Sequence, residues 1–301
     1  MTQVSKGRFG QVITAMITPF RHDGSVDEEA VPKLVNHLLE NGSDGIVVCG
    51  TTGESPTLTH SEKLRLFKQV KQIVAGRGTV LAGTGSNDTQ STIDFGREAE
   101  ELGVDGLLIV GPYYSRPSQD GYYCHFRAAA EAVKIPVMLY NVPTRTAGNI
   151  DAATILRLAR DVENIVAVKE AGGNISQMTE IAADAPEGFE LYSGDDVMTL
   201  PLLAVGGVGV VSVTAHIVGR DMKAMHTAFF SGDIQEATRL HAGMLPICKA
   251  LFQATTPSPA PLKCAMNLLG LPGGGLRLPL LETTAAETEI VRAALANYGL
   301  T

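Results

Sequence analysis

The sequence predicts an α/β fold, a parallel (β/α)8 TIM barrel with additional C-terminal helices. Three observations support this prediction. Short apolar runs alternate with amphipathic helical patterns eight times, the units follow one another at roughly 20 to 35 residues, and no long Gly/Ser-rich or Pro-rich linker separates them. This regular alternation favours a closed barrel over an open doubly wound sheet.

Each predicted strand is a short apolar run, often rich in β-branched residues, as buried parallel strands are. The runs begin near Val12, Ile46, Val80, Leu107, Val137, Ile165, Leu191 and Val210. The first run leads into Thr18-Pro19-Phe20 and not into G-x-G-x-x-G. This turn argues against a dinucleotide-binding sheet.

The helices between the strands are predicted from apolar residues spaced three and four apart. The clearest patterns are Val31, Leu34, Val35 and Leu38; Leu64, Phe67, Val70 and Val74; and Tyr122, Phe126, Ala129 and Val133. Thr59 and Glu62 have the spacing of a capping box. Asp151, Asn174 and Asp196 stand where further helices should begin.

Residues 197–219 carry no formal charge, but Pro201 and Gly206-Gly207 interrupt them, so we expect a buried helix, a turn and a strand instead of a membrane span. After Gly232 the strand signal stops. Helices are predicted at Asp233–Leu251, Pro261–Leu269 and Glu282–Tyr298. We therefore divide the chain into a barrel catalytic domain, residues 1–231, and a helical extension, residues 232–301, that packs on the barrel and is a candidate for assembly contacts.

The composition narrows the class of function. A chain of 301 residues, 45% of them hydrophobic, can bury a large core. Its net charge of -8 and isoelectric point near 5.4 argue against nucleic acid and anionic membranes as partners.

The cysteines, the N-terminal residues and the histidines point to a cytosolic protein without a metal. Cys49, Cys124, Cys248 and Cys264 are scattered and show no C-x-x-C spacing, which is typical of reduced, packed thiols. Residues 1–10 are polar and lack the apolar core of a signal peptide. None of the seven histidines has the spacing of a metal site, so we expect no metal.

The active face of a parallel barrel lies where its strands end. Strand six ends in Val168-Lys169-Glu170, which places an amine at the rim of an apolar strand. Keeping a lysine neutral at pH 7 costs about 4–5 kcal/mol, so a nucleophilic amine needs desolvation or a neighbouring cation. A lone lysine at a strand end is more often simply solvated. Whether Lys169 is catalytic therefore depends on which residues stand at the other strand ends.

Those strand ends carry hydroxyl, phenol and guanidinium groups. They are Thr51 and Thr52 in the turn Gly50–Glu54, Tyr113 and Tyr114 after strand four, and Tyr140 and Arg145 at and after strand five. Strand seven ends in Ser193-Gly194-Asp195-Asp196, whose acids are candidate caps of the next helix, and strand eight ends in Val211-Ser212-Val213-Thr214. Hydroxyls in a glycine turn and an arginine suit carboxylates, and a phenol near an amine can carry a proton. Each signal alone is more often structural, but together they suit Schiff-base chemistry on a keto acid.

Five of these motifs resemble the dihydrodipicolinate synthase (4-hydroxy-tetrahydrodipicolinate synthase) family of the pyruvate-dependent class I aldolase superfamily. They are Gly50-Thr51-Thr52-Gly53-Glu54, Pro112-Tyr113-Tyr114, Tyr140 to Thr146, Val168-Lys169-Glu170-Ala171 and Ser193-Gly194-Asp195-Asp196. They occur in family order, and the resemblance runs from about Val12 to Leu269. It implies a lyase of the diaminopimelate and lysine pathway that condenses pyruvate with L-aspartate 4-semialdehyde.

The resemblance also implies a role for each residue. Lys169 would form the imine with pyruvate, and Tyr140 would shuttle protons through Thr52 to Tyr114 of a neighbouring subunit. Thr51 and Thr52 would hold the pyruvate carboxylate and Arg145 that of the second substrate, while Gly194 and Val211 would line the pocket. The family implies a homotetramer built from tight dimers, with neither metal nor organic cofactor.

Four residues match the family's allosteric lysine site: Ser55, His60, Asn87 and Tyr113. Lys63 and Ser91, however, stand where lysine-inhibited bacterial members resemble one another in carrying His and Glu. The loss of an acid and the gain of a cation should weaken binding of an ammonium group. We therefore expect weak or absent inhibition by L-lysine.

Three alternatives stay open. N-acetylneuraminate lyase and the keto-deoxy sugar acid aldolases share the strand-six lysine and the strand-five tyrosine, although Thr51-Thr52 with Arg145 favours the synthase. A phosphate-binding barrel isomerase is disfavoured because the loops after strands seven and eight lack a glycine-rich phosphate cradle. The third is a non-catalytic keto-acid-binding barrel.

Overall fold

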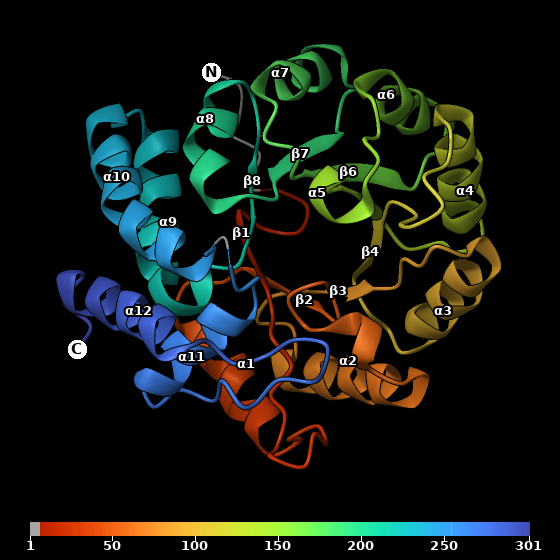
Figure 1. The fold of residues 1–301 in the computed structure, drawn as a ribbon. Helices are drawn as coiled ribbons and strands as arrows, with labels where there is room; N and C mark the ends of the chain where they lie inside the picture. The colour runs from red at the N-terminus through yellow and green to blue at the C-terminus, as the bar shows by residue number, and fades with distance from the viewer. Residues whose placement is uncertain (1–6, 254) are drawn as a thin grey trace.

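The computed structural model describes residues 7–253 and 255–301. Eight parallel strands close into a barrel in sequence order, with β1 paired to β8 (Figure 1). The strands are β1 Val12–Ala15, β2 Gly45–Val48, β3 Thr79–Gly83, β4 Gly106–Val110, β5 Val137–Asn141, β6 Ile165–Glu170, β7 Glu190–Ser193 and β8 Gly209–Ser212. The predicted barrel is confirmed. Residues 1–6 of the predicted polar start lie outside the described residues.

Helices surround the barrel. They are α1 Ala30–Glu40, α2 His60–Val74, α3 Thr89–Glu101, α4 Gln119–Glu131, α5 Pro143–Thr146, α6 Ala152–Asp161, α7 Ile175–Asp184, α8 Thr199–Ala204, α9 Ala215–Ser231, α10 Ile234–Leu251, α11 Ala260–Leu268 and α12 Ala285–Asn297, with short 3₁₀ helices η1 Ser55–Thr57 and η2 Asp196–Met198. Among the described residues, no helix is both long and apolar enough to span a bilayer.

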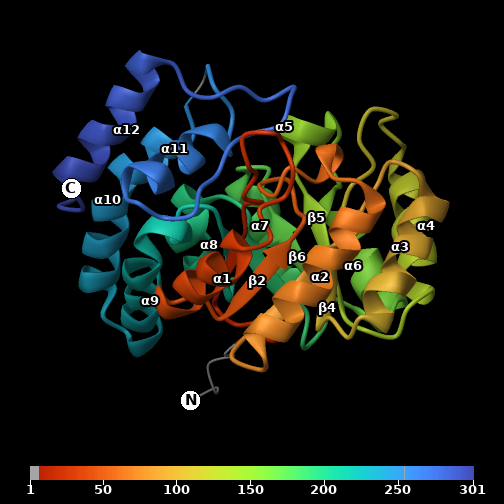
Figure 2. The same cartoon turned by 90° about the horizontal axis from the view of Figure 1, so that it is seen from below.

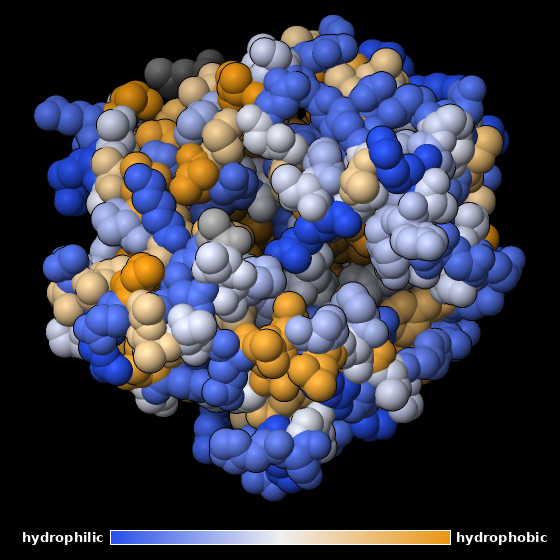
Figure 3. All heavy atoms as spheres, viewed as in Figure 1, coloured by the Kyte–Doolittle hydropathy of each residue, from blue (hydrophilic) through white to orange (hydrophobic). Residues whose placement is uncertain are grey.

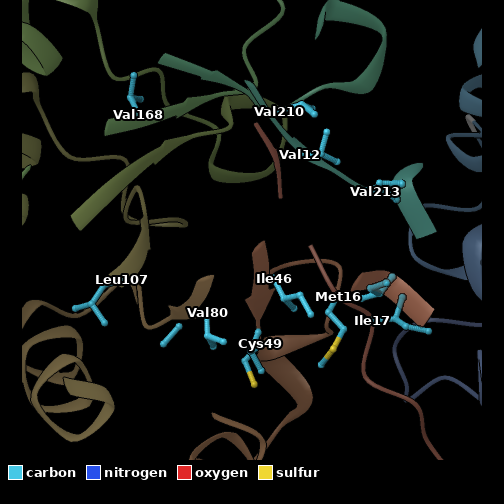
Figure 4. Close-up of a cluster of buried hydrophobic side chains, with 14 of the residues drawn as sticks. Val12, Met16, Ile17, Ile46, Cys49, Val80, Leu107, Val168, Val210 and Val213 are labelled. Carbon is cyan, nitrogen blue, oxygen red and sulfur yellow. The ribbon is translucent and has the colours of Figure 1, made fainter. Parts of the chain in front are cut away.

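Two apolar clusters form the core. The larger lies between the strands and the surrounding helices, and Figure 4 shows part of it, with Val80 and Leu107 on one side of the barrel and Val168 and Val210 on the other. The smaller takes residues from all eight strands and fills the barrel interior: Phe9, Ile13, Ala15, Val47, Leu81, Leu108, Met138, Tyr140, Val142, Ala167, Tyr192 and Val211. Strand side chains alternate between the two clusters because successive residues of a strand face opposite sides.

The local start signals are largely confirmed. The Thr59 hydroxyl and the Glu62 carboxylate form the predicted capping box, and Asn174 caps α7. Asp151 stands at the start of α6 but makes no capping hydrogen bond with its side chain. Asp196 does not cap a helix; Asp195 caps η2, and Asp196 faces β8 instead.

Three sequence predictions need correction. The last helix begins at Ala285 and not at Glu282, because Thr284 and Glu287 form a second capping box there. Val133 lies beyond the end of α4. Cys124 is exposed on α4 and is not a packed thiol.

The C-terminal helices α10, α11 and α12 lie to one side of the barrel (Figure 2), and the segment after α11 reaches η1 and α2, where Arg277 contacts Thr57 and Glu62. The helix α10 packs along α9, the last helix of the barrel. Our domain division at residue 232 stays a prediction.

Candidate active site

Lys169 and Tyr140 face one another at the carboxyl end of the barrel. They are register partners on β6 and β5, and both follow interior residues by two positions, so both side chains point into the barrel. Lys169 is 4% exposed and Tyr140 is 6% exposed. The Nζ atom of Lys169 lies 4.2 Å from the centroid of the Tyr140 ring. Among the described residues, no carboxylate lies within ion-pairing distance of this amine.

Gly194 provides room for the lysine side chain. A Cβ atom at this position would lie 3.0 Å from both Cγ and Cε of Lys169 and 2.6 Å from Cβ of Ala171. Val211 belongs to the interior cluster that also contains Tyr140 and Tyr192. Gly194 therefore lies against the lysine and Val211 lies in the barrel interior, and their predicted role in lining the substrate pocket stays a prediction.

The turn Gly50–Glu54 presents free hydrogen-bond donors. The N–H groups of Gly53 and Glu54 donate back to the carbonyl oxygens of Gly50 and Thr51, at 3.1 and 3.0 Å. Within the described residues, the backbone N–H groups and hydroxyls of Thr51 and Thr52 have no protein partner. Four donors on two adjacent residues can satisfy the acceptor oxygens of a carboxylate.

Arg145 and Tyr114 lie farther out. Arg145, exposed on α5, donates to the carbonyl oxygen of Ser258 at 3.3 Å. Tyr114 is 93% exposed and holds a left-handed backbone with φ of 71°. The structure of one chain therefore does not bring Tyr114 to Tyr140 and Thr52.

A cavity of about 410 Å³ opens at this end of the barrel, on the face that Figure 3 shows hollowed near its centre. Its lining includes Thr51, Tyr140 and Arg145, together with Ser55, His60 and Tyr113 of the candidate lysine site. Lys169, Thr52, Gly194, Val211 and Asn87 are not part of that lining.

Comparison with known proteins shows the family to which the chain belongs. A model of the dihydrodipicolinate synthetase family matches residues 8–298. The chain belongs to this family. The family resemblance that the five sequence motifs carried is thereby confirmed, and with it the interpretation of the chain as a lyase.

Individual members of the dihydrodipicolinate synthetase family are close to this chain. The 4-hydroxy-tetrahydrodipicolinate synthase of Moorella thermoacetica is 54% identical over 293 residues, covering 97% of this chain and 99% of that protein. The dihydrodipicolinate synthase of Bacillus anthracis has a TM-score of 0.93 at 47% identity, covering 96% of this chain and 98% of that one. The enzyme of Cyanidioschyzon merolae, solved with lysine bound, has a TM-score of 0.95 at 47% identity, covering 97% and 99%.

The candidate lysine site of this family member contains an acid that the sequence analysis missed. The carboxylate of Glu98 lies 2.5 Å from Nε2 of His60. Lys63 lies with its Nζ atom 5.5 Å from the centroid of the Phe95 ring, and burial lowers the pKa of this amine. Glu98 stands seven positions after Ser91 on α3, and no motif marks it.

Two acids near the site have structural partners. Asp196 accepts hydrogen bonds from the Ser212 hydroxyl and from the N–H and hydroxyl of Thr214, which ties the β7 loop to the end of β8. Asp195 accepts from the N–H of Val197, and burial raises the pKa of the Asp195 carboxyl. Glu54 is buried against Lys263, a residue of α11 that the sequence analysis also missed.

Proposed function

We propose that the chain condenses pyruvate with L-aspartate 4-semialdehyde through an imine at Lys169, giving 4-hydroxy-tetrahydrodipicolinate for diaminopimelate and lysine synthesis. One observation carries the proposal: the Lys169 amine is almost fully buried against the Tyr140 ring at the end of β6. A buried lysine beside a phenol places a candidate nucleophile next to a group that can carry protons.

The reaction follows from the chemistry of that amine. Lys169 attacks the keto carbon of pyruvate, and loss of one water forms the imine. The protonated imine withdraws electrons, so the pyruvate methyl group loses a proton and the resulting enamine attacks the aldehyde carbon. The amino group of the second substrate then attacks the imine carbon, which closes the ring and frees Lys169. Tyr140 carries the protons of these steps because its phenol ring adjoins the amine.

The substrate carboxylates have two candidate binding groups. We assign the pyruvate carboxylate to the unpaired N–H groups and hydroxyls of Thr51 and Thr52. The second carboxylate is assigned to Arg145, whose guanidinium lines the cavity and makes a single long hydrogen bond to the protein. Gly194 and Val211 shape the pocket around the imine.

Tyr114 is assigned to the site of a neighbouring copy. A tyrosine that is 93% exposed leaves a large apolar surface in water, and insertion into a second subunit would bury it. This exposure supports a contact with a second copy. The homotetramer of tight dimers, in which each site relays protons from Tyr140 through Thr52 to the partner's tyrosine, is proposed from the family resemblance. The free state of the described cysteines favours the cytoplasm as the compartment.

Trapping of the imine tests the function. The protein is treated with pyruvate and borohydride, and mass spectrometry should find one reduced pyruvate adduct per chain at Lys169, and none in Lys169→Arg. Absence of an adduct in the unaltered protein would favour a non-catalytic binding barrel. Pyruvate consumption with L-aspartate 4-semialdehyde, compared with sugar-derived aldehydes, separates the synthase from N-acetylneuraminate lyase and the keto-deoxy sugar acid aldolases.

A further inference from the structure

The C-terminal extension reaches the threonine turn through a buried ion pair. The Nζ atom of Lys263, on α11, lies 2.5 Å from a carboxylate oxygen of Glu54, the last residue of the turn Gly50–Glu54. Both side chains are at most 2% exposed. The partners are 209 residues apart in the chain.

All hydrogen-bond donors of the Lys263 ammonium group have acceptors. Besides Glu54, its ammonium group donates to the carbonyl oxygens of Thr18 at 2.7 Å and Gly275 at 2.6 Å. An ammonium group has three N–H bonds, and all three have acceptors here. The face of Phe20 lies 4.5 Å from the same nitrogen. Lys263 therefore cannot move without breaking several contacts at once.

The turn itself needs an external support. Glu54 holds a left-handed backbone with φ of 55°, which disfavours any residue other than glycine, asparagine or aspartate. Its second carboxylate oxygen accepts from the N–H of Arg277 at 3.1 Å, another residue of the extension. The Thr18 hydroxyl donates to the carbonyl of Gly53 at 2.7 Å. These bonds hold Gly53 and Glu54, at the end of the turn. They therefore leave the donors of Thr51 and Thr52 free.

We propose that Lys263 is a positioning residue for pyruvate: by binding Glu54, it fixes the turn so that the free donors of Thr51 and Thr52 converge on the substrate carboxylate. The C-terminal extension thereby sets the affinity of the barrel for its first substrate. This inference rests on the proposed role of Thr51 and Thr52.

The experiment compares Lys263→Met and Lys263→Arg with the unaltered enzyme. Measured quantities are KM for each substrate, kcat, the melting temperature, and the pyruvate concentration that half-saturates borohydride trapping. Lys263→Met should raise KM for pyruvate and the half-saturating concentration about 10-fold or more, since misplaced binding groups lose much of their effect. KM for L-aspartate 4-semialdehyde should change far less. Lys263→Arg keeps the charge and should restore part of the pyruvate affinity.

A matched control separates positioning from general loss of stability. The hydroxyl of Tyr298, directly after α12, donates to Asp221 of α9 at 2.6 Å, so Tyr298→Phe removes another contact between extension and barrel that does not touch the turn. It should lower the melting temperature and leave KM for pyruvate unchanged. If Lys263→Met does not fold, Glu54→Gln replaces it, because the amide keeps the shape of the side chain but loses the charge and one of the two acceptor oxygens that Lys263 and Arg277 use.

The outcomes are distinct. A folded Lys263→Met with unchanged half-saturation overturns the proposal, as does a parallel rise of both KM values. Thr51→Val tests the carboxylate role by itself. If Thr51→Val raises the half-saturating concentration and the Lys263 and Glu54 variants do not, only the positioning role fails. If Thr51→Val has no effect, the proposed role of the Thr51 hydroxyl in binding the carboxylate fails.

Discussion

Gly194→Ala should slow imine formation by crowding the nucleophile. The added Cβ atom would lie 3.0 Å from Cγ and Cε of Lys169 and 2.6 Å from Cβ of Ala171. Carbon atoms make contact at about 3.5–4.0 Å, so either the lysine chain or the loop after β6 must shift by several tenths of an ångström or more. Overpacking of this kind costs about 1–3 kcal/mol of stability. A displacement near 1 Å at the reacting nitrogen reduces the rate about 100-fold.

The assay is the rate of borohydride-trapped adduct at saturating pyruvate, measured together with urea unfolding. Gly243→Ala is the control, because Gly243 lies within α10 and a Cβ atom there meets no heavy atom within 4 Å. This control should keep the full trapping rate and gain up to about 1 kcal/mol of stability from its helix propensity. A Gly194→Ala enzyme that forms the adduct at the normal rate would refute the placement of Lys169 against Gly194.

Four further predictions follow from the same site and core. Tyr140→Phe should reduce kcat about 10²- to 10⁴-fold with little change in stability, because within the described residues the phenol oxygen has no protein partner; a near-normal kcat contradicts the proton role. Arg145→Ala should raise KM for L-aspartate 4-semialdehyde about 10- to 100-fold, which corresponds to the loss of one charged hydrogen bond. An equal rise of KM for pyruvate in steady-state kinetics would argue against the assignment of Arg145 to the second substrate. L-Lysine should inhibit weakly or not at all in initial-rate assays, and Lys63→His should increase any inhibition; potent inhibition of the unaltered enzyme would show this to be wrong. Burial lowers the pKa of His216 to about 4. The neutral imidazole therefore contributes its full stability above about pH 6.5, and this stability is lost as the pH falls towards 4, at about 1.4 kcal/mol per pH unit. A free energy of urea unfolding that is unchanged between pH 7 and 5 would contradict this prediction.

The neutral form of His216 explains the sign of that pH effect. Its Nδ1 atom lies 2.8 Å from the carbonyl oxygen of Val213, and its Nε2 atom lies 3.2 Å from the backbone nitrogen of Ile17. The imidazole donates to the first and accepts from the second. A second proton would remove the acceptor and leave the N–H of Ile17 without a partner, while adding a charge in a fully buried place.

The barrel was predictable because its signals are local. Each strand is an apolar run, and the strand starts agree with the structure to within one residue: the run near Ile46 begins at Gly45, and the run near Leu107 begins at Gly106. Lys169 and Tyr140 were found for a related reason. Polar residues that end apolar strands must meet at the same end of a parallel barrel, whichever strands carry them.

The residues that hold the site in place could not be predicted from such local signals. A lysine on a C-terminal helix is normally solvated, so nothing in the neighbourhood of Lys263 indicates that it is buried against Glu54. The same holds for Glu98, whose approach to His60 joins two different helices. The start of α12 is a different case, because the capping box of Thr284 and Glu287 is visible in the sequence and was overlooked.

The pairing of Glu54 with Lys263 has a consequence for synthesis on the ribosome. The glutamate leaves the exit tunnel 209 residues before its lysine. At about 5–20 residues per second, the nascent barrel spends roughly 10 to 40 seconds with this carboxylate lacking its cation. Burying an uncompensated charge is strongly unfavourable, so the mouth of the barrel should stay open to water until translation is nearly finished. In nascent chains that end before Lys263, proteases should therefore still cleave the Gly50–Glu54 turn while the strands of the barrel are protected.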